Sequence, residues 1–399
     1  MIDIHGATAV PSSDLDPFSD AFLSDPYPSY LQLRELGPVV FLERYGAFCL
    51  PRYAEVHRVL NDWESFCSGR GVGLTDFAKV PPWRPLSLLL EADPPLHSKA
   101  RAVVARVLSA KALRDKRAVF AAEAERLVEQ LVHKGSFDGV TELAQAYPVR
   151  VFPDAIGLGE SGRENLLPYG DMVFNAYGPQ NRLLERSMQH AEPVSAWITA
   201  QCERSALDAQ GFGAQIYAYA DAGEITDQEA ALLVRSLLTA GVDTSVTGLA
   251  ATLYAFSHNP DQWAQLRQDP GLTRAAFDEA LRLESPVQTF FRTTTRAVDV
   301  GGVSLPEGAK VFMSLASANR DERRWEQPDR FDIRRRTTGH VAFGAGIHVC
   351  IGQMVARMEV ELIIRALAKR VERIEPAGEV RWRLNNSMRA YSSLPLSVR

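Results

Sequence analysis

The stretch that decides the fold reads Phe343-Gly344-Ala345-Gly346-Ile347-His348-Val349-Cys350-Ile351-Gly352. It predicts a loop broken by glycines that ends in one cysteine, and residues 353–362 continue in a helical pattern. Glycines such as Gly344 let the backbone turn tightly and lie close against a flat ligand. Phe343 can cover the sulfur, and His348 can donate to an anionic group. Amides at the helix start would point at the sulfur, so we expect them to lower the pKa of the Cys350 thiol.

The cysteines favour a single ligand rather than a cluster. The chain has four, with no paired spacing among them: Cys49, Cys67, Cys202 and Cys350. This scatter argues against a disulfide framework and fits a reducing compartment. A screened thiolate with no second cysteine nearby suits haem iron better than zinc, which takes four ligands.

Residues 343–352 fill each defining position of F-G-x-G-x-H-x-C-x-G, and so resemble the haem-binding loop of the cytochrome P450 family. The alternative is a buried cysteine after a flexible loop, but long motifs of mixed residue types rarely arise by chance. The resemblance runs from roughly residue 20 to the C-terminus. It implies a mainly α fold with small β-sheets, the family's triangular helix-rich prism around buried haem b (iron protoporphyrin IX), as one domain over residues 1–399. Gln353 departs from the small residue usual after this loop.

Composition bounds the partners and the compartment. The chain has 399 residues and a net charge of −5, so no global basic field argues for binding nucleic acid. No apolar run approaches the length of a membrane span, and the N-terminus lacks the basic and apolar regions of a signal peptide. We therefore expect a cytoplasmic protein without a membrane anchor, similar to the soluble bacterial members of the family. Residues 1–25 are polar and predict a loosely held arm.

Short elements surround a long loop. Residues 79–95 contain five prolines and predict a shaped loop of the kind that often carries binding residues. The elements expected elsewhere are helices at Tyr27–Leu36, Tyr53–Leu60 and from Leu96, and strands at Pro38–Phe41, Ala47–Leu50, Thr293–Ala297 and Gly302–Val311.

The helix that opens at Leu96 carries cationic groups. His97 and Arg101 are four residues apart and share one face, which suits two carboxylates; the alternative is a solvated basic surface. The resemblance implies that both bind haem propionates, together with Arg292 and His348. Residues 99–117 hold seven Lys or Arg and one acid, a local charge of +6. Such a patch predicts a docking surface for an acidic partner, which the resemblance identifies as a [2Fe-2S] ferredoxin.

A long central helix is predicted from residue 226 to about residue 256. Thr226-Asp227-Gln228-Glu229 is a capping box at its start. Gly241 weakens the helix interior, and the Thr244 hydroxyl can bond back to the carbonyl of Ala240. Together these residues predict a local groove. The alternative is a kink that only packs.

The groove carries a second motif. Residues 240–244, Ala-Gly-Val-Asp-Thr, match the oxygen-activation motif of the family. The resemblance implies that Thr244 holds dioxygen and a water while Asp243 relays protons from solvent. Ala240 would lie against the haem, as would Phe343 and Gly344 of the cysteine loop.

Glu279 and Arg282 are three residues apart on a predicted helix. Alone they indicate an ordinary surface ion pair of little energetic value. The resemblance implies instead a buried pair tied to the segment before the haem loop, with a role in folding and haem retention.

The resemblance implies a haem-thiolate monooxygenase that receives electrons from a ferredoxin and its NAD(P)H-dependent reductase and inserts one atom of O2 into its substrate. The loop 79–95 resembles that of members that oxidise para-substituted benzoic acids such as 4-methoxybenzoate, by O-demethylation or hydroxylation. Charge-assisted bonds would hold the carboxylate, and aromatic rings would clamp the substrate ring. The expected substrate residues are Arg84, Ser87, Ser236, Phe290, Phe174, Tyr177 and Val287. The alternative for Arg84 is a solvated loop residue.

Two other functions stay open at this point. One is a peroxide-driven haem enzyme without a redox partner, against which the intact Asp243-Thr244 pair argues. The other is a haem-bound gas sensor or carrier, which needs neither a proton relay nor a pocket arginine.

Overall fold

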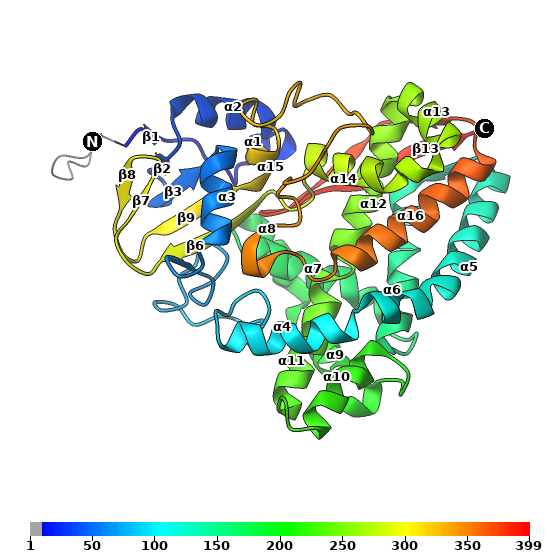
Figure 1. The fold of residues 1–399 in the computed structure, drawn as a ribbon, viewed down its shortest axis with the longest axis horizontal. Helices are drawn as coiled ribbons and strands as arrows, with labels where there is room; N and C mark the ends of the chain where they lie inside the picture. The colour runs from blue at the N-terminus through cyan, green and yellow to red at the C-terminus, as the bar shows by residue number, and fades with distance from the viewer. Residues whose placement is uncertain (1–9) are drawn as a thin grey trace.

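Helices form most of the chain that the computed structural model describes, residues 10–399. The largest sheet lies at the side of the N-terminus, and a strand of a smaller sheet lies near the C-terminus at the opposite side (Figure 1). The predicted mainly α fold with small β-sheets is thereby confirmed. The helices are α1 (Asp20–Ser24), α2 (Tyr27–Leu36), α3 (Tyr53–Asn61), α4 (Leu96–Val107), α5 (Ala110–Lys134), α6 (Pro148–Ile156), α7 (Leu166–Asn175), α8 (Arg182–Ser187), α9 (Ala191–Gln201), α10 (Phe212–Asp221), α11 (Asp227–Ala240), α12 (Asp243–His258), α13 (Pro260–Gln268), α14 (Thr273–Glu284), α15 (Leu315–Asn319) and α16 (Gln353–Arg370). No helix within residues 10–399 combines the length and the apolar character needed to cross a membrane.

The largest sheet has six strands and joins distant parts of the chain. Its order is β1 (Ser12–Ser13), β2 (Val40–Leu42), β3 (Ala47–Leu50), β9 (Lys310–Ser314), β6 (Thr289–Thr294) and β4 (Phe66–Cys67). The smaller sheets are β10 (Ile374–Pro376) with β13 (Pro395–Val398) and β5 (Ser136–Asp138), β11 (Arg381–Leu384) with β12 (Arg389–Ser393), and β7 (Val298–Val300) with β8 (Val303–Leu305). Strand β6 matters most for the site, because it carries two of the predicted site residues, Phe290 and Arg292.

The expectation of a loosely held arm is wrong for residues 10–25. Strand β1 pairs in parallel with β2, and α1 follows it. The Phe18 and Phe22 side chains are buried and pack edge-to-face against other rings of the core. These two aromatic side chains supply the apolar area that anchors an otherwise polar segment. Residues 1–9 lie outside the described part of the chain.

The predicted long central helix is two helices, α11 and α12, interrupted at Gly241 and Val242. The capping box of Thr226 and Glu229 is confirmed at the start of α11. At the break, the Thr244 hydroxyl donates to the Ala240 carbonyl at 2.6 Å, an acceptor that an uninterrupted helix would pair with the amide of residue 244.

Glycine is required at this break by close packing. A Cβ on Gly241 would lie 2.2 Å from the Phe152 ring of α6 and 2.7 Å from the Leu237 carbonyl oxygen. Any side chain there would push α6 away from the break. The groove that the sequence predicted is therefore a full interruption of the helix, held open by a hydroxyl and by the absence of a side chain.

Helix α16 buries an acid behind the cysteine loop. Glu359 is fully buried, and neither of its carboxylate oxygens accepts a hydrogen bond from the described residues. Burial raises the pKa of Glu359 from 4.5 to about 8, and the nearby Ser245 hydroxyl opposes the shift. A carboxyl that loses water without gaining donors keeps its proton, so this group is neutral at pH 7.

We expect Glu359 to make the folded protein less stable as the pH rises. Its pKa is raised in the folded state, so the folded chain holds a proton that the unfolded chain releases. The resulting loss of stability develops between about pH 4.5 and pH 8 and should total on the order of 5 kcal/mol. Urea unfolding of the holoprotein at pH 5, 7 and 9 should show this loss, and Glu359→Gln should remove it. The exposed Glu160→Gln is the matched control, and an equal pH dependence in all three proteins would contradict the expectation.

Candidate active site

The cysteine loop is held in a conformation that needs its glycines. Gly344 and Gly346 have φ values of 70° and 64°, in the left-handed region that favours glycine. A Cβ on Gly346 would also lie 2.3 Å from the Leu60 carbonyl oxygen. The amide of Cys350 donates to the Phe343 carbonyl at 2.8 Å, which closes the loop just before α16. The cysteine is thereby presented from a rigid turn.

Electrostatics at the Cys350 sulfur differ from the expectation. Burial raises the pKa of the thiol. The amides of Gly352 and Gln353 do point at the sulfur and act to lower the pKa, as do the guanidinium groups of Arg101 and Arg357. The predicted lowering is therefore wrong for the protein chain alone, because the loss of water outweighs these donors. A bound cation at the sulfur would add the missing stabilisation of the thiolate.

Four predicted anion-binding residues gather beside this loop. The rings of His97 and His348 lie 4.3 Å apart. Arg101 donates to the Val349 carbonyl at 2.7 Å, and Arg292 of β6 is buried and donates to the Phe291 carbonyl at 2.8 Å. His97 is buried, and neither of its ring nitrogens has a partner among the described residues.

The pKa values of this group indicate unpaired positive charge. Burial lowers the pKa of His97, with Arg101 as the second cause. Burial also lowers the pKa of Arg101 and brings that of Arg292 to about 10. No carboxylate of the described chain lies within 4 Å of either guanidinium. Buried cations of this kind need an anion, so the residues fit the two propionates of a haem.

His348 is the exception among these residues. Its Nδ1 lies 3.0 Å from the Leu89 carbonyl oxygen, and its Nε2 lies 3.1 Å from the Ser68 hydroxyl. Burial, with Arg292 next, lowers its pKa to about 3, so the ring is neutral at pH 7. Because both nitrogens have protein partners, His348 links the cysteine loop to the loop of residues 79–95. His348 was expected to donate to an anionic group, but in this structure both of its ring nitrogens are occupied by Leu89 and Ser68.

Asp243 of the oxygen-activation motif has an ion-pair partner that the sequence did not predict. Asp243 is 2% exposed, and both of its carboxylate oxygens accept from Nη2 of Arg383 on β11, at 2.8 Å each. Arg383 also lies 4.0 Å from Asp171 of α7, a carboxylate that is partly exposed. Burial raises the pKa of Asp243, and Arg383 opposes that shift. Arg383 was not predicted, because its strand lies 140 residues from the motif in sequence.

The predicted aromatic residues of the substrate site form one cluster. Tyr177 lies with its ring centroid 5.8 Å from that of Phe174 and 5.8 Å from that of Phe290. Val287 lies three residues before Phe290 and pairs with Met388 in an isolated β-bridge. The structure therefore brings the three rings together from α7, the turn after it and β6.

The predicted polar residues of the substrate site also meet. The hydroxyls of Ser87 and Ser236 lie 3.1 Å apart. Arg84 has a side chain that is 10% exposed, and it holds the buried carboxylate of Glu91 through two hydrogen bonds of 2.9 and 3.1 Å. The alternative of a solvated loop arginine is wrong. Glu91 was missed, although its place four residues after Ser87 in the same loop was a usable signal.

The predicted basic patch of residues 99–117 is largely neutralised by other helices. Lys99 pairs with Glu229 and Arg106 with Glu224, while Arg117 binds Glu361. The positive electrostatic potential of this surface is weaker than its local charge of +6 predicted, because the compensating acids come from distant parts of the chain. The ion pairs of the patch are mostly exposed and contribute little to stability.

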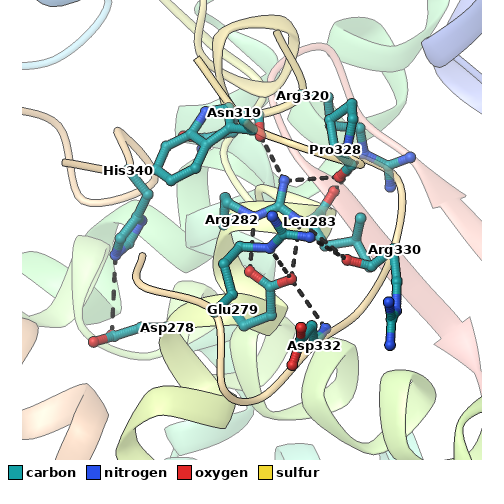
Figure 2. Close-up of polar contacts among 12 residues, drawn as sticks. Asp278, Glu279, Arg282, Leu283, Asn319, Arg320, Pro328, Arg330, Asp332 and His340 are labelled. Carbon is teal, nitrogen blue, oxygen red and sulfur yellow. Dashed lines mark hydrogen bonds and ion pairs between the residues drawn. The ribbon is translucent and has the colours of Figure 1, made fainter. Parts of the chain in front are cut away.

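The Glu279–Arg282 pair is fully buried, so the alternative of a surface ion pair is wrong (Figure 2). Arg282 donates to the carbonyls of Asn319 at 2.7 Å and Pro328 at 2.8 Å. Glu279 accepts from the Asp332 amide at 3.1 Å. The pair therefore ties α14 to the segment that precedes the cysteine loop.

Known proteins resemble this chain along almost all of its length. The family profile named Cytochrome P450 matches residues 199–386. Cytochrome P450 CYP199A2 of Rhodopseudomonas palustris is 53% identical over 99% of this chain and 96% of the relative. Cytochrome P450 107B1 of Saccharopolyspora erythraea is 32% identical over 96% of this chain and 97% of the relative. The solved structure of cytochrome P450 CREJ in complex with (4-ethylphenyl) dihydrogen phosphate has a TM-score of 0.85 and 26% identity, covering 96% of this chain and 99% of that one.

These likenesses agree with the geometry of the site. They confirm the predicted fold, whose cysteine loop, broken helix and buried Glu279–Arg282 pair occur in the order expected. With relatives of this identity over nearly the whole chain, the protein belongs to the cytochrome P450 family and is a monooxygenase with haem b as its cofactor.

Proposed function

We propose that residues 1–399 act as a single cytoplasmic domain that oxidises the para substituent of small aromatic acids such as 4-methoxybenzoate. The observation that carries this proposal is that Arg84 adjoins Tyr177 of the aromatic cluster and shares Glu91 with the Ser87 amide, while the Ser87 hydroxyl meets that of Ser236. Guanidinium and hydroxyl donors suit a carboxylate, and the aromatic rings suit a benzene ring. The solved relative that binds (4-ethylphenyl) dihydrogen phosphate holds another para-substituted benzene ring with an anionic group, which supports this class of substrate.

Haem b, when bound, supplies the site at which dioxygen is activated. Cys350 would bind its iron through the sulfur, and His97, Arg101 and Arg292 would bind its propionates. Phe343, Gly344 and Ala240 would lie against it, as the family motifs imply. His97, Arg101, Ala240 and Arg292 come from helices and a strand, which favours a fixed orientation of the cofactor.

The chain's own residues would then manage protons and orientation. Asp243 would carry protons toward the break between α11 and α12, and the Thr244 hydroxyl would hold a water there. The Asp243 pKa is raised by burial, which brings the carboxyl closer to the pH at which it can both take and give a proton. The ring cluster would direct the para substituent away from the carboxylate end.

Electrons would come from a [2Fe-2S] ferredoxin and its NAD(P)H-dependent reductase. The neutralised patch of residues 99–117 leaves a smaller surface for this partner than its sequence suggests. Among the cations there, Arg114 and Lys116 have no acidic partner within the described chain. Leu96 of α4 and Met354 of α16 are exposed large apolar residues. We infer a docking surface that combines apolar contact with a few charges.

A ligand titration of the purified ferric protein tests the substrate class. We expect 4-methoxybenzoate to shift the Soret band from the low-spin to the high-spin position, because a ligand near the iron displaces its water. The methyl ester should bind at least about tenfold more weakly, since it brings no charge to the buried donors. A shift with neutral ligands alone would keep the monooxygenase and remove the aromatic acid. No shift with any ligand would also remove the proposed substrate class.

A further inference from the structure

Two arginines meet at one carbonyl oxygen beside the proposed carboxylate site. Arg84 donates to the Pro85 carbonyl at 2.9 Å, and Arg235 of α11 donates to the same oxygen at 2.6 Å. Arg235 also donates to the Leu86 carbonyl at 3.1 Å. Two guanidinium groups so close together repel each other strongly when they are shielded from water. The arrangement therefore requires negative charge.

Glu91 provides one negative charge, and its carboxylate pairs with only one of the two arginines. Its buried carboxylate binds both terminal nitrogens of Arg84 and also accepts from the Ser87 amide at 2.8 Å. Arg235 is 8% exposed and has no acidic partner within 4 Å among residues 10–399. Burial is the largest influence on both guanidinium groups and acts to lower the pKa of each. At Arg84 the opposing effects of Glu91, Tyr177 and Tyr169 together raise the pKa, whereas the pKa of Arg235 is lowered.

The remaining polar atoms of this cluster point to a missing anion. The Nε of Arg84 is buried and has no hydrogen-bond partner among the described residues. The Ser87 and Ser236 hydroxyls bond mainly to each other and to nearby backbone. Tyr169 and Tyr177 also adjoin the arginines, and burial raises the pKa of each, so both are neutral at pH 7. Two cations and one anion leave a net charge of +1.

We propose that Glu91 is a specificity-determining residue, which cancels the charge of Arg84 so that the site keeps a single positive charge matched to one carboxylate. This inference rests on the proposed function. The net charge then selects monoanions: a neutral ester leaves the buried charge of Arg235 uncompensated, and a second carboxylate at the same end of the ring would add an uncompensated negative charge.

Four proteins separate this charge count from a simple positioning role. The wild type has a net charge of +1 at the cluster, Arg84→Met has 0, Glu91→Gln has +2, and the double variant Arg84→Met with Glu91→Gln returns to +1. Spectral titration with 4-methoxybenzoate in chloride-free buffer measures each Kd, because small anions would compete for the cluster. Its methyl ester serves as the neutral control ligand.

We expect Kd to follow the charge. Arg84→Met should weaken benzoate binding at least about tenfold, Glu91→Gln should tighten it about tenfold, and the double variant should return to within about threefold of the wild type. Phthalate, with carboxylates on two adjacent ring carbons, should bind Glu91→Gln and not the wild type. Ester binding should change little in any variant.

Other results would overturn the inference in distinguishable ways. If Glu91 only holds Arg84 in place, the double variant will bind no better than Arg84→Met, and Glu91→Gln will bind more weakly than the wild type. If Arg84→Met fails to fold because it leaves the buried Glu91 unpaired, the other three proteins still decide between these outcomes. A wild type that binds no benzoate would instead remove the proposed function, and the inference with it.

Discussion

Replacing Arg282 with methionine is expected to destabilise the folded protein strongly and to remove most of its bound haem. Arg282 and Glu279 are 0% exposed, and the guanidinium supplies hydrogen bonds to carbonyls of the segment 319–330. Its loss would leave the carbonyls of Asn319 and Pro328 without this donor. It would also remove one of the two arginines that bind the buried Glu279 carboxylate, since Arg335 remains. Breaking a buried pair in this way costs about 3–5 kcal/mol, a large part of a total stability of about 5–15 kcal/mol.

The effect should reach the haem site through Asn319. Its side-chain oxygen accepts from the Val341 amide at 2.8 Å, two residues before the cysteine loop, while its carbonyl accepts from Arg282. Loss of Arg282 therefore frees both the segment and the loop that follows it. We expect purified Arg282→Met to show little haem absorbance and a lowered urea midpoint.

Arg336→Met is the matched control for this experiment. Arg336 lies in the same segment and is exposed, with no side-chain hydrogen bond among the described residues. The control should load haem and unfold as the wild type does. Arg282→Lys should resemble Arg282→Met, because an ammonium cannot reproduce the planar fork that spans Glu279 and the carbonyls. Normal haem content and normal stability in Arg282→Met would contradict the assigned role.

The features that could be predicted from sequence are those written in adjacent residues. The cysteine loop is ten residues of mixed type, and its glycines are needed by local backbone angles at Gly344 and Gly346. The capping box of Thr226 lies within four residues, and helix α2 has the predicted bounds, Tyr27–Leu36. The bonding of Thr244 back to Ala240 is equally local. Such features depend on short-range sterics and hydrogen bonds, which a pattern contains.

The features that could not be predicted depend on partners far along the chain. Arg383 reaches Asp243 across 140 positions, and the acids that neutralise Lys99 and Arg106 come from α11 and the turn before it. The pKa of Cys350 was expected to be lowered and is instead raised, because the surrounding chain excludes water from the thiol. A sequence motif does not contain this effect. The break at Gly241 was underestimated for the same reason, since Phe152 packs there from another helix.

Replacing Asp243 with asparagine is expected to slow product formation about 100-fold while leaving substrate binding unchanged. A positioned acid or base typically contributes 10²–10⁴-fold to a rate, and the amide keeps the shape of the carboxylate but cannot carry a proton. Asp243 lies on α12, beyond the helix break from Arg235 and Ser236 of α11. The Kd for 4-methoxybenzoate should therefore stay within about twofold of the wild-type value. Turnover with saturating ferredoxin and reductase, at pH 7, measures the rate.

The partners of Asp243 decide what the slow rate means. Arg383 binds both carboxylate oxygens, so a proton can leave Asp243 toward Thr244 only when this ion pair opens. If Asp243 carries the proton, Asp243→Asn should show a larger solvent deuterium isotope effect than the wild type, because proton delivery has become rate-limiting. Asp171→Asn, which alters the other carboxylate near Arg383 without touching the motif, is the control and should keep most of the rate. If both variants slow turnover equally and neither changes the isotope effect, the Asp243–Arg383 pair serves only to hold α12 against β11, and protons reach the site by another route.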